Sequence, residues 1–172
     1  MLVSKMVSGG QTGVDRGALE AAWERGFPYG GLIPKGRLAE DGIVPEKFDK
    51  MTIAVRKDYL FRTEWNVTHS DATLIIAREP WTDNVSNECS ACTEELMGET
   101  KRTADYCREH GKPHLVIFKA NVSKVVDWLN GLGKTDIVLN VAGPRESKAV
   151  DIQEATKTFV TRLIEKLKEG QK

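Results

Sequence analysis

A glycine-rich stretch near residue 10, Ser8-Gly-Gly-Gln-Thr-Gly13, separates an apolar run from a helical pattern. Glycine adopts positive φ angles and lets a ligand approach the main chain closely. The helix that follows presents unpaired N–H groups and a positive dipole end, which attract anions. Arg16 lies in the first turn of this helix, where the dipole disfavours a positive charge. Its presence there is explained if it also faces a phosphate or carboxylate. The stretch predicts an anion site, although it matches neither G-x-G-x-x-G nor a P-loop. The alternative is a tight turn capped by Thr12.

A second segment repeats this pattern further along the chain. Both GGQT…ERGFP and MGET…REHGKP read G-x-T, then a helical stretch, then G-x-P, then an apolar run. Two helix N-termini, at Thr12 and Thr100, would then face one crevice and suit a ligand with a phosphate and a second polar group. The alternative is that these motifs are ordinary helix caps and turns of an α/β protein.

The loop Pro34–Gly42 concentrates charges of both signs, since it contains Lys35, Arg37, Glu40 and Asp41. Its bases could hold an anion while its acids hold a ribose or heterocycle. A loop of this composition is otherwise simply solvated, and residue types alone do not separate the two interpretations.

Two further segments place an arginine near the expected crevice. Arg62 and Asn66 are spaced i, i+4 and therefore share one helix face. Arg145 follows a Gly-Pro turn at the end of the last apolar run, and such a turn lets it fold back over the strand ends. The alternatives are an exposed polar stripe and a surface turn, respectively.

No metal site is predicted. Cys89 and Cys92 form a single CxxC, which lacks the second Cys or His pair of a structural zinc site. The three histidines show no metal-ligand spacing, and the G-x-S-x-G nucleophile motif is absent. Incidental thiols are favoured over a metal or redox role for the stretch 81–96.

Bulk properties limit the class of protein. The 172 residues fit a single domain, 1–172, and 25 basic side chains balance 25 acidic ones. Zero net charge provides no global field for nucleic acid or anionic membranes, and no apolar run approaches the roughly 20 residues that span a bilayer. With three cysteines and no signal-peptide pattern, we expect a cytoplasmic protein that binds neither nucleic acid nor membrane.

The elements that must position these residues alternate along the chain. We expect strands at 2–7, 29–33, 51–55, 72–77, 114–118 and 137–141. We expect helices at 14–25, 59–70, 100–110, 123–132 (capped by Ser123) and from 152 to about 167. This alternation predicts an α/β fold with one doubly wound, mainly parallel, Rossmann-like sheet flanked by helices. The segments after residues 7, 77 and 141 then lie on the same edge of the sheet.

The chain resembles the putative molybdenum carrier family, related to the algal molybdenum cofactor carrier protein. The resemblance spans nearly the whole chain and rests on the stretches SGGQTGVDRGALEAA, GLIPKGRLAEDG, YLFRTEWNV, SDATLII, GETKRTADYCREHGKP and LNVAGPRES. It implies a Rossmann-type fold, a homo-oligomer (dimer or tetramer) and a small phosphate-bearing ligand over the glycine loops. That ligand would be the molybdenum cofactor, a pterin with one phosphate, or a nucleotide, with no metal bound directly by protein side chains.

Carried over residue by residue, the resemblance implies a set of binding residues, which are Gly9, Gly10, Thr12, Gly13, Arg16, Lys35, Arg37, Glu40, Asp41, Arg62, Gly98, Thr100 and Arg145. The chain departs from the family at Glu99, where members tend to have glycine. This change leaves open whether a carboxylate faces the site.

Three functions fit these residues, and a binding or carrier protein is favoured. The alternatives are an enzyme that cleaves nucleotide N-glycosidic bonds and a nucleotide-sensing module. Related lysine-decarboxylase-like phosphoribohydrolases look to carry a glutamate where this chain has Thr103. The weak substitutes for that catalytic carboxylate are Glu40 and Asp41, with Glu99 a further acid nearby.

Overall fold

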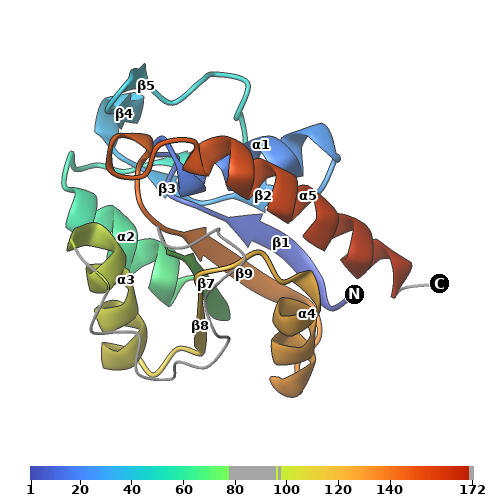
Figure 1. Ribbon diagram of the computed structural model, residues 1–172. Helices are drawn as coiled ribbons and strands as arrows, with labels where there is room; N and C mark the ends of the chain where they lie inside the picture. The colour runs from blue at the N-terminus through green and yellow to red at the C-terminus, as the bar shows by residue number, and fades with distance from the viewer. Residues whose placement is uncertain (78–95, 97, 171–172) are drawn as a thin grey trace.

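A five-stranded parallel sheet forms the centre of the computed structural model, which describes residues 1–77, 96 and 98–170 (Figure 1). The strands lie in the order β2-β1-β9-β7-β8, and each neighbouring pair is parallel. Their bounds are β1 (Val3–Val7), β2 (Tyr29–Gly30), β7 (Ala72–Ile76), β8 (His114–Ile117) and β9 (Ile137–Ala142). This arrangement confirms the predicted fold class.

The strand order is that of a dinucleotide-binding sheet with its numbering shifted. If the strands are counted from β9 and then β1, β2, β7 and β8, the order across the sheet becomes 3-2-1-4-5. The order reverses between β9 and β7, which is where such sheets bind ligands, beyond the carboxyl ends of the strands. The carboxyl ends of β1, β7 and β9 share this edge, as predicted from the sequence.

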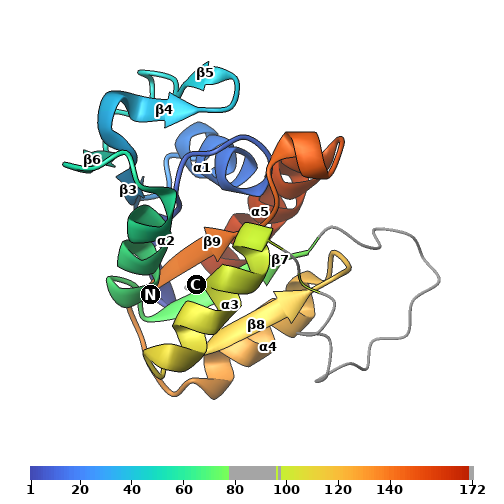
Figure 2. The ribbon, with the colours of Figure 1, turned by 90° about the vertical axis from the view of Figure 1, so that its left-hand side faces the viewer.

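Helices cover both faces of the sheet (Figures 1 and 2). On one face, α1 (Val14–Glu24), α4 (Val122–Gly131) and α5 (Ile152–Glu169) join the strands in the largest hydrophobic cluster. On the other face lie α2 (Tyr59–Thr68) and α3 (Gly98–Glu109), the latter packed on Ile75 through Ala104. Successive residues of β7 serve opposite faces because side chains alternate along a strand. Its residues are buried throughout, as expected for a central strand.

A small irregular region extends beyond the main sheet. It contains β3 (Leu32–Ile33) paired in parallel with β6 (Thr52–Ile53), and β4 (Leu38–Ala39) paired with β5 (Gly42–Ile43) in a hairpin. The prediction of one strand over 29–33 was wrong. Gly31 has a φ of 125°, which turns the chain and sends β2 and β3 to different sheets.

The start of α4 differs from the prediction. The predicted Ser123 cap was wrong, because α4 begins one residue earlier and Asn121 accepts the N–H of Lys124 at 2.9 Å. Cys89, Cys92 and nearly all of the stretch 81–96 lie outside the described residues. None of the helices in the described part of the chain combines the length and hydropathy of a bilayer-spanning segment.

Candidate functional site

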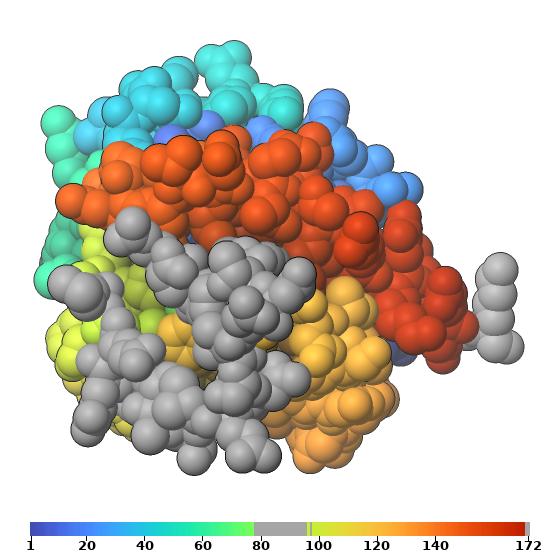
Figure 3. All heavy atoms as spheres, in the orientation of Figure 1, coloured from blue at the N-terminus to red at the C-terminus, as the bar shows by residue number. Residues whose placement is uncertain are grey.

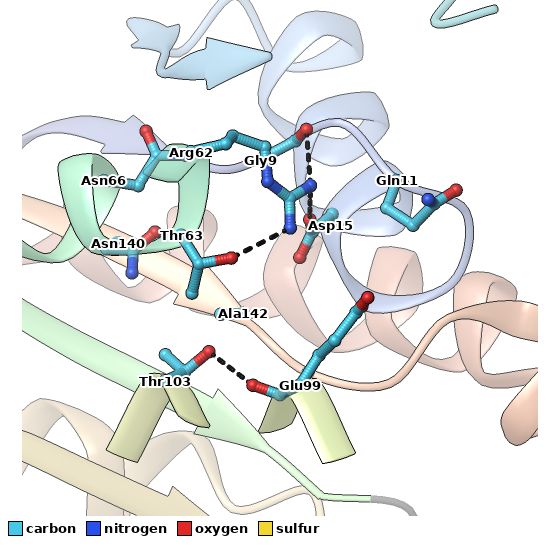
Figure 4. A pocket seen from close by; sticks show the side chains of 11 residues that line it. Gly9, Gln11, Asp15, Arg62, Thr63, Asn66, Glu99, Thr103, Asn140 and Ala142 are labelled. Carbon is cyan, nitrogen blue, oxygen red and sulfur yellow. Dashed lines mark hydrogen bonds and ion pairs between the residues drawn. The ribbon is translucent and has the colours of Figure 1, made fainter. Parts of the chain in front are cut away.

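A pocket opens at the carboxyl edge of the sheet, between the ends of β1 and β9 and the helices α2 and α3 (Figure 4). It encloses about 380 Å³ of empty space, its open mouth included. It is lined by Gly9, Gln11, Asp15, Arg62, Thr63, Asn66, Glu99, Thr103, Asn140, Ala142 and Gly143. It lies beside the point where the strand order reverses, at the edge where sheets of this topology bind ligands.

Arg62 forms the floor of the pocket. It reaches from α2 to the loop after β1, where its Nη1 donates to the Gly9 carbonyl at 2.9 Å and lies 3.3 Å from Asp15 Oδ2. Nη2 donates to Thr63 Oγ1 at 3.2 Å. The side chain is only 6% exposed, yet its Nε has no partner among the described residues. One donor of this buried cation is therefore left without an acceptor in the part of the chain that the structure describes.

Gly9 leaves the space that the Arg62 guanidinium group occupies. A Cβ at this position would lie 2.6 Å from the Arg62 Cζ and 2.8 Å from Asp15 Oδ2, so any larger residue would displace the guanidinium. The first glycine of the sequence motif thus makes room for an arginine of the same chain.

Gln11 provides a second unpartnered donor. Its Oε1 accepts the N–H groups of Thr12 at 3.0 Å and Glu40 at 2.9 Å, which fixes the orientation of the side-chain amide. Its Nε2 is buried and has no partner within the described ranges. Two residues that line one pocket, Arg62 and Gln11, thus each have a buried donor, Nε and Nε2 respectively, without an acceptor among the described residues.

Asp15 is a buried carboxyl group with an altered proton affinity. Its pKa is raised from 3.8 to about 6, chiefly because the group is buried; the nearby Arg62 guanidinium opposes the increase, and the negative charge of Glu99 contributes to it. The pocket therefore contains an acid that exchanges its proton close to neutral pH.

We expect Asp15 to make the stability of the protein pH-dependent. Because the folded pKa exceeds the unfolded one, the folded state binds the proton more tightly, and stability from this group is lost as the pH rises from about 4 to about 6. A shift of this size corresponds to roughly 3 kcal/mol. The free energy of unfolding of Asp15→Asn, minus that of the wild type, should increase across this range in urea titrations. A difference that is flat or decreases with pH would contradict the assignment.

The mouth of the pocket carries a second group of charges. Arg145, from the segment after β9, donates through Nη2 to Glu99 of α3, and its Nη1 lies 3.9 Å from Glu40 Oε2. Glu40 also accepts from Thr12 Oγ1 and, at 2.6 Å, from Ser147 Oγ. Burial opposes ionisation of Glu40, but the hydrogen bonds from Ser147 and Thr12 lower its pKa overall. Glu40 thereby joins the loop after β3 to the segment after β9, which lie against each other on the outer surface (Figure 3).

Comparisons with known proteins show the family of this chain. The model of the circularly permutated YpsA SLOG family matches residues 6–164. The chain belongs to this family. The permutation agrees with the strand order, which becomes that of a Rossmann sheet when counting starts from β9. A crystal structure named as a putative molybdenum carrier protein from Syntrophus aciditrophicus SB is 35% identical, covers 94% of both chains and superposes with a TM-score of 0.77. No curated protein matches the chain.

Only part of the residue set implied by the resemblance gathers at the pocket of this family member. Gly9 and Arg62 line it, as does Glu99, whose side chain points into it (Figure 4), and Arg145 lies beside it as the ion-pair partner of Glu99. Gly98 begins α3, and Thr100 is buried there without lining the pocket. Lys35 is exposed on the loop after β3.

Two arginines of that set bind the protein's own backbone. Arg16 donates through Nε and Nη2 to the Gly10 carbonyl, both at 3.2 Å, and pairs with Asp41 at 3.0 Å. Arg37 donates to the carbonyls of Val44 and Pro45 at 3.0 and 2.7 Å. These guanidinium groups hold the loop after β3 in place.

The N-terminus of α1 is already occupied by protein groups. Gly13, not Thr12, is the N-cap, and no side chain caps the helix. The N–H of Gly13 donates to Gln153 Oε1 at 3.1 Å and that of Val14 to the Pro144 carbonyl at 3.1 Å. Among the buried side-chain atoms of the described residues, the donors without acceptors at the pocket belong to Arg62 and Gln11.

Sequence reasoning missed several pocket residues, Asp15 above all. An acidic residue in the first turn of a helix is explained by the helix dipole, so nothing local marks Asp15 as special. Its role depends on Arg62, 47 residues away. In the described part of the chain no three His, Cys, Asp or Glu side chains gather as a metal-binding group.

Proposed function

We propose that this protein binds a small phosphate-bearing ligand in the pocket at the carboxyl edge of the sheet. The observation that carries the proposal is the pair of buried donors without acceptors, Arg62 Nε and Gln11 Nε2. A buried donor left unpaired costs about 1–3 kcal/mol, and more when it belongs to a charged group. Oxygen atoms of a ligand would remove this cost, which supports an occupied state with acceptors at these positions.

The chemistry of the donors supports a phosphate or a similar oxyanion. Arginine forms short, charge-assisted and often bidentate hydrogen bonds with phosphate oxygens, and Arg145 places a second guanidinium at the mouth. The pterin of the molybdenum cofactor and a nucleotide both combine a phosphate with a polar heterocycle. The similarity to a protein named as a putative molybdenum carrier supports a carrier-like role, with a molybdenum-related ligand such as this pterin cofactor.

Adenosine 5′-monophosphate serves as the test probe, with adenosine as the control that lacks the phosphate. In isothermal titration calorimetry we expect AMP to bind at least about 30-fold more tightly, which corresponds to roughly 2 kcal/mol from charged hydrogen bonds. Mass spectrometry and pterin fluorescence of the purified protein would identify a bound pterin ligand. Equal binding of AMP and adenosine, without any co-purified phosphate compound, would contradict the proposal.

A second candidate function, cleavage of a nucleotide N-glycosidic bond, is favoured by Asp15. Its carboxyl group lies in the pocket with a pKa of about 6, suited to donating a proton to the departing base while water adds to the sugar carbon. Glu40 and Asp41 do not line the pocket, and the pKa of Glu40 is lowered rather than raised. Incubation with AMP should then release adenine and ribose 5-phosphate, and Asp15→Asn should stop the release. If AMP binds but stays intact over hours, the hydrolase function is contradicted and only the carrier function remains.

A further inference from the structure

The charges around the pocket are not balanced for an added anion. Three carboxyl groups, Asp15, Glu40 and Glu99, accompany two guanidinium groups, Arg62 and Arg145. A phosphate would bring further negative charge to a site that already contains an excess of acids. Binding would be opposed by like-charge repulsion unless one carboxylate moved away or took up a proton.

Glu99 is the carboxylate whose movement breaks the fewest contacts. Its side chain is 40% exposed, and within the described residues its carboxylate is paired with Arg145 alone. Glu40 is held by hydrogen bonds from Thr12 and Ser147 as well as by Arg145. Asp15 is 5% exposed and packed against Arg62.

Arg145, whose guanidinium group is paired with Glu99, lies near the same aromatic ring as Arg62. The Cζ atoms of Arg145 and Arg62 lie 5.9 and 5.7 Å from the centre of the same ring, that of Tyr59. One cation is thus buried and the other lies at the mouth, with the Glu99 side chain reaching from α3 across the pocket toward the loop after β1 (Figure 4).

We propose that Glu99 is an internal counter-anion, which the ligand's phosphate must replace at Arg145. This inference rests on the proposed function and adds a specificity-determining residue to it. A neutral compound cannot substitute for the Glu99 carboxylate and leaves the ion pair closed. An anionic compound takes over the Arg145 guanidinium while Glu99 turns toward solvent. Glu99 therefore restricts the site to ligands with a strong anionic group, at some cost in affinity.

The test is a double-substitution cycle in AMP titrations. Glu99→Gln keeps the shape of the side chain but removes the competing charge, so we expect about three- to tenfold tighter AMP binding, with adenosine changed by less than twofold. In an Arg145→Gln background the same substitution should give a clearly smaller gain, because the group for which the two anions compete is gone and only the repulsion by Glu99 is relieved. Glu109→Gln is the matched control, since Glu109 lies at the other end of α3 and pairs with Arg102.

The outcomes separate this inference from the proposed function. Wild-type binding of AMP that Glu99→Gln leaves unchanged or weakens would overturn the inference and leave the proposed function intact. A gain of the same size in the Arg145→Gln background would also overturn it, because the competition would not involve Arg145. Absence of AMP binding in every variant would overturn both. Circular dichroism and thermal melts confirm that each variant is folded.

Discussion

Replacing Arg62 with methionine should weaken AMP binding by at least about 100-fold. Arg62 is the buried cation of the pocket, and its Nε is the donor without an acceptor. Truncating one member of a buried, charged hydrogen-bonding set costs about 2–5 kcal/mol or more. The substitution also leaves Asp15 buried without its cation, and the loss of Arg62 should raise the pKa of that carboxyl group further. Titration calorimetry measures the affinity.

A conservative variant separates binding from folding. Arg62→Lys keeps the positive charge but removes the Nε donor and the planar fork, so we expect a folded protein with an intermediate loss of affinity. Arg108→Met is the matched control, because Arg108 is an exposed arginine of α3 paired with Asp105. Arg62→Met and Arg62→Lys proteins that bind AMP as tightly as the wild type would show that the ligand lies elsewhere.

A large loss of stability is expected for Gly13→Ala. Gly13 has a φ of 81° and a ψ of −132°, a region that residues with a Cβ avoid. A Cβ here would meet the backbone of the segment after β9, with the Arg145 carbonyl carbon at 2.7 Å. Strain and backbone displacement together should cost about 3 kcal/mol or more. For a chain of this size the Tm would fall by roughly 6–12 °C in calorimetry.

Gly131→Ala provides the control for this substitution. Gly131 is the last residue of α4, and a Cβ there meets nothing within 4 Å. Alanine is a better helix former than glycine, so this variant should be neutral or more stable by up to about 1 kcal/mol. Equal Tm values for the Gly13→Ala and Gly131→Ala proteins would contradict the strain that we assign to Gly13.

Gly13 also connects stability with the site. Because Gly13 has no side chain, the backbone of residues 144–146 can pack against it. This segment positions Arg145 beside the pocket, where it pairs with Glu99. The Pro144 carbonyl accepts the N–H of Val14 at 3.1 Å, so the start of α1 and the end of β9 hold each other. A glycine that reads in the sequence as part of a phosphate loop thus contributes by allowing two backbone segments to meet.

The sequence by itself was enough for the elements and their common edge. The apolar run 72–77 is short and continuous enough to indicate a buried strand, and the helical stretches between the expected strands favour parallel connections. The i, i+4 spacing of Arg62 and Asn66 correctly placed both side chains on one face, and both line the pocket. These features depend on periodicity within a few residues, which a sequence displays directly.

Only the tertiary structure decided which charges face the pocket. Arg16 and Arg37 bind backbone carbonyls because the loop after β3 folds back on the motif, with Arg37 itself at a φ of 56°. Asp15 becomes a pocket acid because Arg62 of α2 and Glu99 of α3 approach it from distant parts of the chain. The partner of a charged side chain depends on loop conformation and burial, and neither is encoded in the spacing of neighbouring residues.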